Sequence, residues 1–285
     1  MNRYRAELLA HTKASVGECP LADGVDHLIW LDIRQQTIWR TELGSGRSTR
    51  HDRHDHVSAI GHCRSGGYIT AGNRSFARLR SLGDSETVIT TVGADPNIRF
   101  NDGKVDPWGR FVAGTAVIGS TPELGGLYML DNAGGTARLL SCVTISNGLD
   151  WAPDRRSFYY VDTPKQRIDR FNVDPDTGQL LDREVFASID QRLGLPDGLA
   201  VDSEGCLWLA VWGSGAVIGF DPDGREIARI DVPVSCPTSC TFGDSDGKTL
   251  FITTARASDD DGSPLAGAVF AVRMTVSGQP VRCFG

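Results

Sequence analysis

Long apolar runs are missing from this 285-residue chain, and so is any concentrated stretch of lysine or arginine. No segment approaches the roughly 20 apolar residues of a membrane-spanning helix, so we expect no membrane partner. The 29 basic residues are outnumbered by 36 acidic ones, for a formal net charge of −7, and we therefore expect no nucleic-acid partner either. Residues 1–20 carry charges around only a short apolar patch, which is not the pattern of a secretion signal.

The cysteine pattern and the short motifs argue against further classes of protein. Seven cysteines, an odd number scattered along the chain, do not fit a small secreted disulfide scaffold, so we expect reduced thiols and a cytoplasmic location. Cys236 and Cys240 have no second pair at zinc-site spacing, and we interpret them as buried thiols. GxxxxGK[ST] does not occur, so nucleotide-binding chemistry has no support. The letters GDSDG at 243–247 match Gly-x-Ser-x-Gly, but they form the Asp/Gly turn of the sixth copy of the repeat described below, and we expect no serine-hydrolase elbow there.

What the chain does contain is a repeated unit: a small or polar entry segment, a short apolar run, an Asp/Gly turn and a second strand rich in aromatic and β-branched residues. Six copies begin GECPLADGVDHLIWLD, VSAIGHCRSGGYITAG, RFNDGKVDPWGRFVAGT, SNGLDWAPDRRSFYYVD, LPDGLAVDSEGCLWLAVW and CPTSCTFGDSDGKTLFITT. Equivalent positions in successive copies lie 39 to 50 residues apart: Leu21, Ile60, Lys104, Leu149, Leu199 and Cys240. This spacing is typical of the four-stranded blades of a propeller.

The repeat therefore predicts an all-β fold, a six-bladed β-propeller of four-stranded antiparallel blades. Residues 1–285 show no linker and no shift in composition, so we expect a single domain. A closed ring leaves no sheet edge exposed, and we expect the early strand Tyr4–Ala10 to complete the last blade beside Ala268–Met274.

Polar residues occupy the same place in several copies, just before the innermost strand. In a propeller these segments surround one mouth of the central channel, so their side chains should meet there. They are Glu18, Ser58, Asn101 with Asp102, Asn147, Asp197, and Thr238 with Ser239. Two carboxylates with amide oxygens form a hard ligand set for Ca²⁺, Mg²⁺, Mn²⁺ or a less selective Zn²⁺. A divalent ion would also hold both carboxylates ionised despite their mutual repulsion.

Two other interpretations compete with this one. Asp or Asn before Gly is common in turns, which would explain Asp102-Gly103, Asn147-Gly148 and Asp197-Gly198 one by one. Their shared position in separate copies favours a common site instead. The segment HDRHDH at 51–56 has the look of a metal cluster, but we place it in an outer strand or turn away from the channel mouth and interpret it as a solvated loop.

Four segments resemble the senescence marker protein, regucalcin and gluconolactonase family: GECP at 17–20, RFNDGKVDPWGRFVAGT at 99–115, SNGLDWAPD at 146–154 and PDGLAVDSEGCLWLAVW at 196–212. The resemblance implies a six-bladed propeller with one divalent ion (Ca²⁺, Zn²⁺, Mn²⁺, Mg²⁺ or Fe²⁺) held by Glu18, Asn147 and Asp197. It also implies that Arg99 and Asn101 contact the substrate. Some relatives carry a substrate-binding acid after AGT, where this chain reads AVIGSTPE, and Glu123 is the residue expected in that role.

The function implied by the resemblance is metal-dependent hydrolysis of a small sugar lactone, an aldonolactone, in carbohydrate catabolism by a monomer or weak homo-oligomer. We expect Asp197 to accept the proton of the attacking water and Arg99 to hold the substrate, although Arg99 has an alternative as a surface ion-pair partner of Asp95 or Asp102. A non-catalytic calcium-binding or protein-interaction propeller is the competing hypothesis. Such a scaffold would not need a cationic side chain, Arg99, beside a metal ion with an open ligand position. The same site acting on aryl esters or organophosphates is a third.

Overall fold

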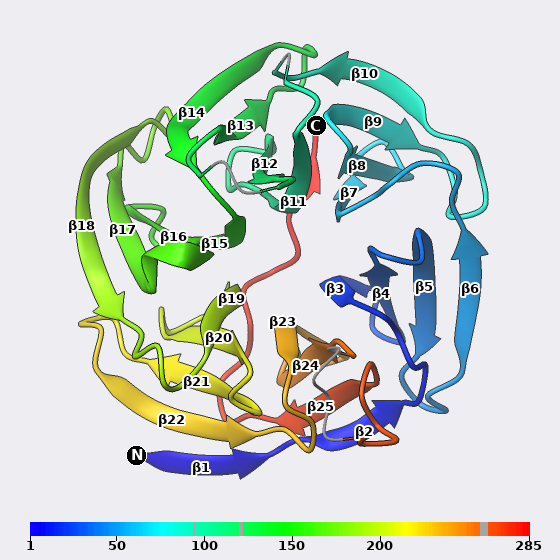
Figure 1. Cartoon of the computed structure of the whole chain (residues 1–285), viewed down its shortest axis with the longest axis vertical. Helices are drawn as coiled ribbons and strands as arrows, with labels where there is room; N and C mark the ends of the chain where they lie inside the picture. Colours follow the sequence, from blue (N-terminus) through cyan, green and yellow to red (C-terminus); the bar gives the residue numbers. More distant parts are fainter. Residues whose placement is uncertain (94, 120–121, 257–261) are drawn as a thin grey trace.

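The computed structural model describes residues 1–93, 95–119, 122–256 and 262–285. Six small sheets stand around a central axis as the blades of a propeller (Figure 1), which confirms the predicted fold class. In each blade the chain runs outward from the axis through successive antiparallel neighbours. Within the described ranges the chain forms one short 3₁₀ helix, η1 (Thr163–Lys165), and no helix there has the length and hydrophobicity to cross a bilayer.

The strands within each blade follow one another along the chain from the innermost outward. Blade 1 contains β3 (Gly17–Asp23), β4 (His27–Asp32), β5 (Thr37–Glu42) and β6 (Ser48–Asp52), and blade 2 contains β7 (Ala59–Cys63), β8 (Tyr68–Gly72), β9 (Ser75–Leu79) and β10 (Thr87–Thr91). Blade 3 contains β11 (Ile98–Val105), β12 (Phe111–Val117), β13 (Gly125–Leu130) and β14 (Thr136–Val143), and blade 4 contains β15 (Ser146–Trp151), β16 (Ser157–Asp162), β17 (Arg167–Val173) and β18 (Leu180–Ser188). Blade 5 contains β19 (Leu195–Val201), β20 (Leu207–Trp212), β21 (Ala216–Phe220) and β22 (Glu226–Asp231), and blade 6 contains β23 (Pro237–Gly243), β24 (Thr249–Thr254) and β25 (Val269–Arg273).

Burial follows the position of a strand in its blade. Every residue of β15 is buried, and so is every residue of β24, because neighbouring blades cover both faces of these inner strands. The outermost strand β18 is mostly exposed. The short apolar or β-branched stretches of such inner strands recur in each blade, which is why the repeat was visible in the sequence.

The amino terminus closes the ring. The strand β2 (Glu7–Ala10) pairs antiparallel with β25 as the fourth strand of blade 6, with Glu7 opposite Ala271, which confirms the predicted closure. The predicted strand Tyr4–Ala10 is nevertheless divided. Its first part belongs to β1 (Asn2–Arg5), which pairs in parallel with β22 of blade 5. The amino-terminal end of the chain is thus joined to the two last blades.

The carboxyl terminus crosses the axis. Residues 277–285 form a C-terminal strap, which leaves blade 6 and runs across the centre of the ring (red in Figure 1). The strap forms a bridge from Gly278 to Asp202 of blade 5. It ends as β26 (Cys283–Phe284), which lies in parallel against the inner edge of β7. The strap therefore ties together blades that are distant in sequence.

Candidate ion and substrate site

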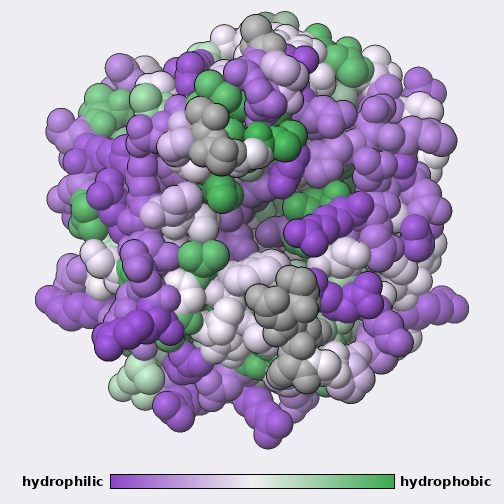
Figure 2. Space-filling model, viewed as in Figure 1, coloured by the Kyte–Doolittle hydropathy of each residue, from purple (hydrophilic) through white to green (hydrophobic). Residues whose placement is uncertain are grey.

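One mouth of the channel holds a pocket of about 980 Å³. Five predicted site residues line it together, and they come from blades 1, 3, 4 and 5: Glu18, Arg99, Asn101, Asn147 and Asp197. Figure 2 shows a hollow with hydrophilic side chains near the centre of this face. The structure therefore brings together residues that lie up to 179 positions apart, from Glu18 to Asp197.

Irregularities in the innermost strands aim these side chains at the axis. The pairing of β3 with β4 shifts between Glu18 and Leu21, and that of β19 with β20 shifts between Pro196 and Leu199. Comparable shifts occur in β11 between Phe100 and Asp102, in β15 between Ser146 and Leu149 and in β23 between Pro237 and Ser239. A bulge of this kind re-aims a side chain beside an active site. The shared position seen in the sequence is thus a shared bulge.

The Asx-Gly pairs lie in strands, so the turn interpretation is wrong. Gly103, Gly148 and Gly198 belong to β11, β15 and β19, and none of the three has a positive φ. Glycine is needed at these positions because neighbouring blades approach so closely at the hub that a Cβ would not fit. A Cβ on Gly148 would lie 2.6 Å from the carbonyl oxygen of Asp197, and a Cβ on Gly198 would lie 2.8 Å from the Cα of Ser239.

Adding a methyl group at these glycines is expected to destabilise the protein. Gly148→Ala and Gly198→Ala should each lower the free energy of unfolding by about 1–3 kcal/mol, because backbone atoms must move to admit the Cβ. Thermal denaturation measures the loss. Gly44→Ala is the control, since nothing lies within 4 Å of a Cβ there. Equal stability of all three variants would contradict the close approach.

A hydrogen-bond network fixes the amides. Asn147 donates from Nδ2 to Oγ1 of Thr163 (2.8 Å), and Thr163 in turn donates to the carbonyl of Pro196 (2.8 Å). The Oδ1 of Asn147 accepts from Nδ2 of Asn101 (3.0 Å), and the Oδ1 of Asn101 accepts from Nη1 of Arg99 (2.9 Å). Arg99 therefore lies within the pocket network and not in the alternative ion pair. Thr163 was not found by sequence reasoning.

Two buried aspartates hold the segments that enter β3 and β15. Asp32 accepts from the backbone nitrogens of Ser15 (2.7 Å) and Val16 (3.2 Å). Asp162 accepts from the backbone nitrogen of Ile145 (2.9 Å). The two aspartates end equivalent strands, β4 and β16, in the sequences HLIWLD and SFYYVD. This repeated Asp was a signal in the sequence for residues that position the site.

The carboxylates of the pocket are buried and close enough to repel each other. Burial, and then the negative charge of Asp102, raise the pKa of Glu18 to about 8. Burial, Glu18 and Asp102 raise the pKa of Asp197 well above its ordinary value. Arg99 opposes the rise at Glu18 but is a smaller effect. The positive charge of Arg99 thus does not balance the carboxylates that meet in this pocket.

The donor set fits a hard divalent ion. The Oδ1 of Asp197 is buried and has no hydrogen-bond partner, which is costly unless something else binds it. The Oδ1 of Asn147 faces the pocket with one accepted hydrogen bond and a second lone pair free. In the part of the chain that the structure describes, no group of three or more His, Cys, Asp or Glu side chains is arranged to hold a metal. The ligand set expected from the sequence is not of that kind, because its third oxygen comes from the amide of Asn147.

Two further residues are placed differently from the main group. His56 lines the pocket mouth, so the expectation that the whole histidine-rich segment lies away from the mouth is wrong. Burial and the charge of Arg99 lower the pKa of His56 to about 4, so this imidazole is neutral. Glu123 lies outside the pocket lining, with its carboxylate 3.9 Å from Nζ of Lys165 and its side chain 56% exposed. A contact between Glu123 and substrate stays a prediction.

Comparisons with known proteins agree with the propeller fold and identify the family. The SMP-30/gluconolactonase/LRE-like region matches residues 16–256. The Bacillus subtilis protein named "Putative sugar lactone lactonase YvrE" is 36% identical over 286 residues, covering 97% of both chains, and regucalcin of Homo sapiens is 34% identical over 284 residues, covering 95% of both. The crystal structure of a calcium-binding regucalcin from Agrobacterium tumefaciens superposes with a TM-score of 0.93 at 28% identity, covering 100% of this chain and 98% of that one. On the extent of these matches, the chain belongs to the SMP-30/gluconolactonase/LRE-like family.

Proposed function

We propose that this protein hydrolyses a sugar lactone to the corresponding hydroxy acid, using a divalent ion held by Glu18, Asn147 and Asp197. The observation that carries the proposal is the buried Oδ1 of Asp197, which has no partner in a pocket that also contains a cationic anchor, Arg99. A relative named as a sugar lactone lactonase supports the substrate class. An aldonolactone is the proposed substrate, and the cytoplasm is the proposed location.

The ion would supply Lewis-acid stabilisation of the negative charge that develops on the lactone carbonyl oxygen. The side chains of the pocket accept the proton and position the substrate. With its Oδ1 on the ion, Asp197 would accept the proton of the attacking water at its second carboxylate oxygen. Arg99 and Asn101 hold the ring hydroxyls and the carbonyl in place. Ile98, Ile118 and Trp212 also line the pocket and provide apolar wall for the carbon face of the sugar.

The test is proton release from a panel of five- and six-membered aldonolactones, because ring opening at neutral pH yields an acid. The protein is assayed as purified, after chelation, and after Ca²⁺, Mg²⁺, Mn²⁺, Zn²⁺ or Fe²⁺ is restored singly. We expect hydrolysis that depends on the ion and favours one ring size. Hydrolysis of aryl esters or organophosphates alone would replace the substrate class, and ion binding without any turnover would favour the non-catalytic propeller.

Replacing the cationic anchor is expected to weaken substrate binding. Arg99→Met should raise KM about tenfold or more and leave kcat less affected, because it removes a charge-assisted hydrogen bond made in both ground and transition states. Initial-rate kinetics with the best lactone of the panel measure the effect. Arg192→Met is the control, since Arg192 pairs with Asp190 on the exposed surface. An unchanged KM in Arg99→Met would show that this guanidinium does not bind substrate.

A further inference from the structure

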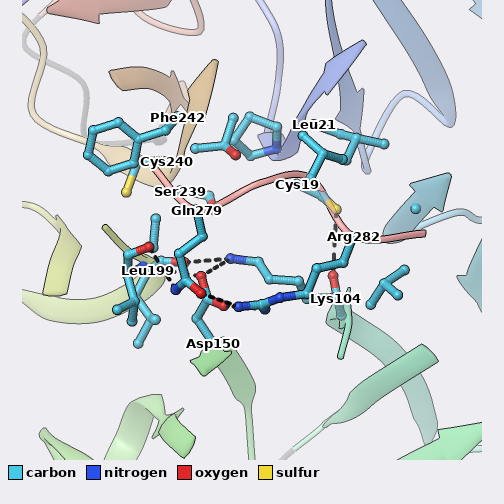
Figure 3. Close-up of a pocket in the computed structure, with 18 of the residues that line it drawn as sticks. Cys19, Leu21, Lys104, Asp150, Leu199, Ser239, Cys240, Phe242, Gln279 and Arg282 are labelled. Atoms are coloured by element: carbon cyan, nitrogen blue, oxygen red, sulfur yellow. Dashed lines mark hydrogen bonds and ion pairs between the residues drawn. The ribbon is translucent and has the colours of Figure 1, made fainter. Parts of the chain in front are cut away.

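A second, smaller cavity lies on the axis behind the ion site. This axial chamber, of about 90 Å³, is lined by side chains that the proposed mechanism does not use, among them Asp102, Lys104, Asp150 and Arg282. Figure 3 shows Lys104, Asp150 and Arg282 converging beneath the C-terminal strap, with Gln279 beside them. The strap contributes Gln279 and Arg282 to the chamber wall. Charged groups in such a confined space interact strongly with one another.

Lys104 is anchored at a defined position in the chamber. Its Nζ donates to Oδ2 of Asp150 (2.9 Å) and to the carbonyl of Leu199 (3.2 Å). Asp150 is buried and accepts a second charged donor, Nη1 of Arg282 (2.8 Å), at its other oxygen. Arg282 is held in turn by Oε1 of Gln279 (2.6 Å). Asp150 thus binds Lys104 with one oxygen and the strap residue Arg282 with the other, while the carbonyl of Leu199 also holds Lys104.

Asp102 adjoins the ion site through its neighbours on β11. It is buried, lines the chamber, and its Oδ1 accepts from the backbone nitrogen of Gly103 (2.7 Å). The residues on either side of it reach the proposed ligands: Asn101 donates from Nδ2 to Oδ1 of Asn147 (3.0 Å), and the carbonyl of Gly103 accepts from Sγ of Cys19 (3.9 Å), the residue after Glu18. In keeping with this position, the negative charge of Asp102 raises the pKa of both Glu18 and Asp197. Burial raises the pKa of Asp102, and the charge of Lys104 is the largest effect that lowers it.

We propose that Asp102 and Lys104 are positioning residues of the ion site: Asp102 supplies a third negative charge behind Glu18 and Asp197, and Lys104, anchored by Asp150 and the carbonyl of Leu199, offsets it. The inference rests on the proposed ion site and adds to it. The pair sets how tightly a divalent cation binds and how stable the ion-free protein is. Neither side chain needs to touch the ion, because charge interactions in a poorly solvated interior extend beyond contact distance.

The test compares ion-free and Ca²⁺-saturated protein by calorimetric titration with Ca²⁺ and by thermal denaturation. Lys104→Met is expected to tighten Ca²⁺ binding about tenfold and to lower the Tm of the ion-free form more than that of the saturated form. Asp102→Asn is expected to weaken binding by a similar factor and to raise the ion-free Tm. The double variant should return toward the wild-type Kd, because both charges are then absent.

Arg282→Gln is the matched control. It removes a cation from the same carboxylate, Asp150, and should lower the Tm equally in both forms with no change in Kd. If Lys104 were a structural ion-pair partner only, Lys104→Met would behave in the same way, and this outcome would overturn the proposal. Should Lys104→Met fail to fold, an unchanged Kd in Asp102→Asn overturns it independently.

The ion site itself is tested separately with Glu18→Gln. If this variant loses Ca²⁺ binding while Lys104→Met and Asp102→Asn bind as the wild type does, only the role of the pair is wrong. If Glu18→Gln retains wild-type affinity, the ion site proposed at the pocket is wrong as well. The two failures are therefore distinguishable.

Discussion

Asp197→Asn is expected to reduce kcat for lactone hydrolysis by about a thousandfold, measured with saturating divalent ion. Asparagine keeps the size of the side chain but cannot accept a proton from water. The ion-free variant should also unfold at a higher temperature than the wild type at pH 8. Burial, Glu18 and Asp102 raise the pKa of Asp197, so folding the wild type above the ordinary pKa requires uptake of a proton or burial of a charge.

Asp202→Asn is the matched control in the same blade. Asp202 is also buried, but its Oδ1 accepts from the backbone nitrogen of Glu204 (2.9 Å) and its Oδ2 from the indole of Trp208 (2.9 Å). Its replacement should lower stability and leave kcat unchanged. The two variants are therefore expected to change stability in opposite directions, and only Asp197→Asn is expected to lower kcat. Wild-type turnover in Asp197→Asn would dismiss this residue as the base.

Removal of the ion is expected to be the other large effect. Chelation should abolish lactone hydrolysis and lower the Tm, because Glu18 and Asp197 are then left buried without a counter-ion. Restoring one divalent ion should recover both. Activity is followed by proton release and stability by thermal denaturation, with elemental analysis to establish that the chelated protein is free of metal.

Glu18→Gln is expected to weaken ion binding without the use of a chelator. It removes one of the two carboxylate ligands, so Ca²⁺ affinity should fall about a hundredfold, and the Tm should respond little to chelator. Glu226→Gln removes a carboxylate at the exposed start of β22, outside the pocket, and is the control for the same change of net charge. Full activity in metal-free wild-type protein would refute the role of the ion.

Much of the fold was predictable because propeller blades repeat. Each copy has to bury an inner strand between neighbours, so the apolar runs recur at regular spacing and mark the six blades. The pairing of β2 with β25 was predictable for a related reason, since an unpaired edge in a closed ring is unfavourable. The division of the first strand at Ala6 was not predictable. It depends on the backbone bond from Ala6 to Asp231 (2.9 Å), a contact between the first strands and blade 5.

The polar residues of the site were predictable as a group but not in their individual roles. Glu18, Asn147 and Asp197 share a position in the repeat, and the structure places all three in one pocket. The place of His56 was misjudged because the histidine-rich segment spans an outer strand and the pocket rim. Thr163 gave no signal in the sequence, since its role depends on a carbonyl in the next blade.

The sequence by itself determined the six-fold repeat, the closure of the ring and the set of polar residues at its hub, because these follow from local periodicity and from a position shared by separate copies. Only the tertiary structure decided which way each side chain points. Bulges in the inner strands turn Glu18 and Asp197 toward the axis, and the strap brings Arg282 to Asp150 across 132 positions of chain. Such contacts join blades that the sequence separates, so no local pattern of residues encodes them.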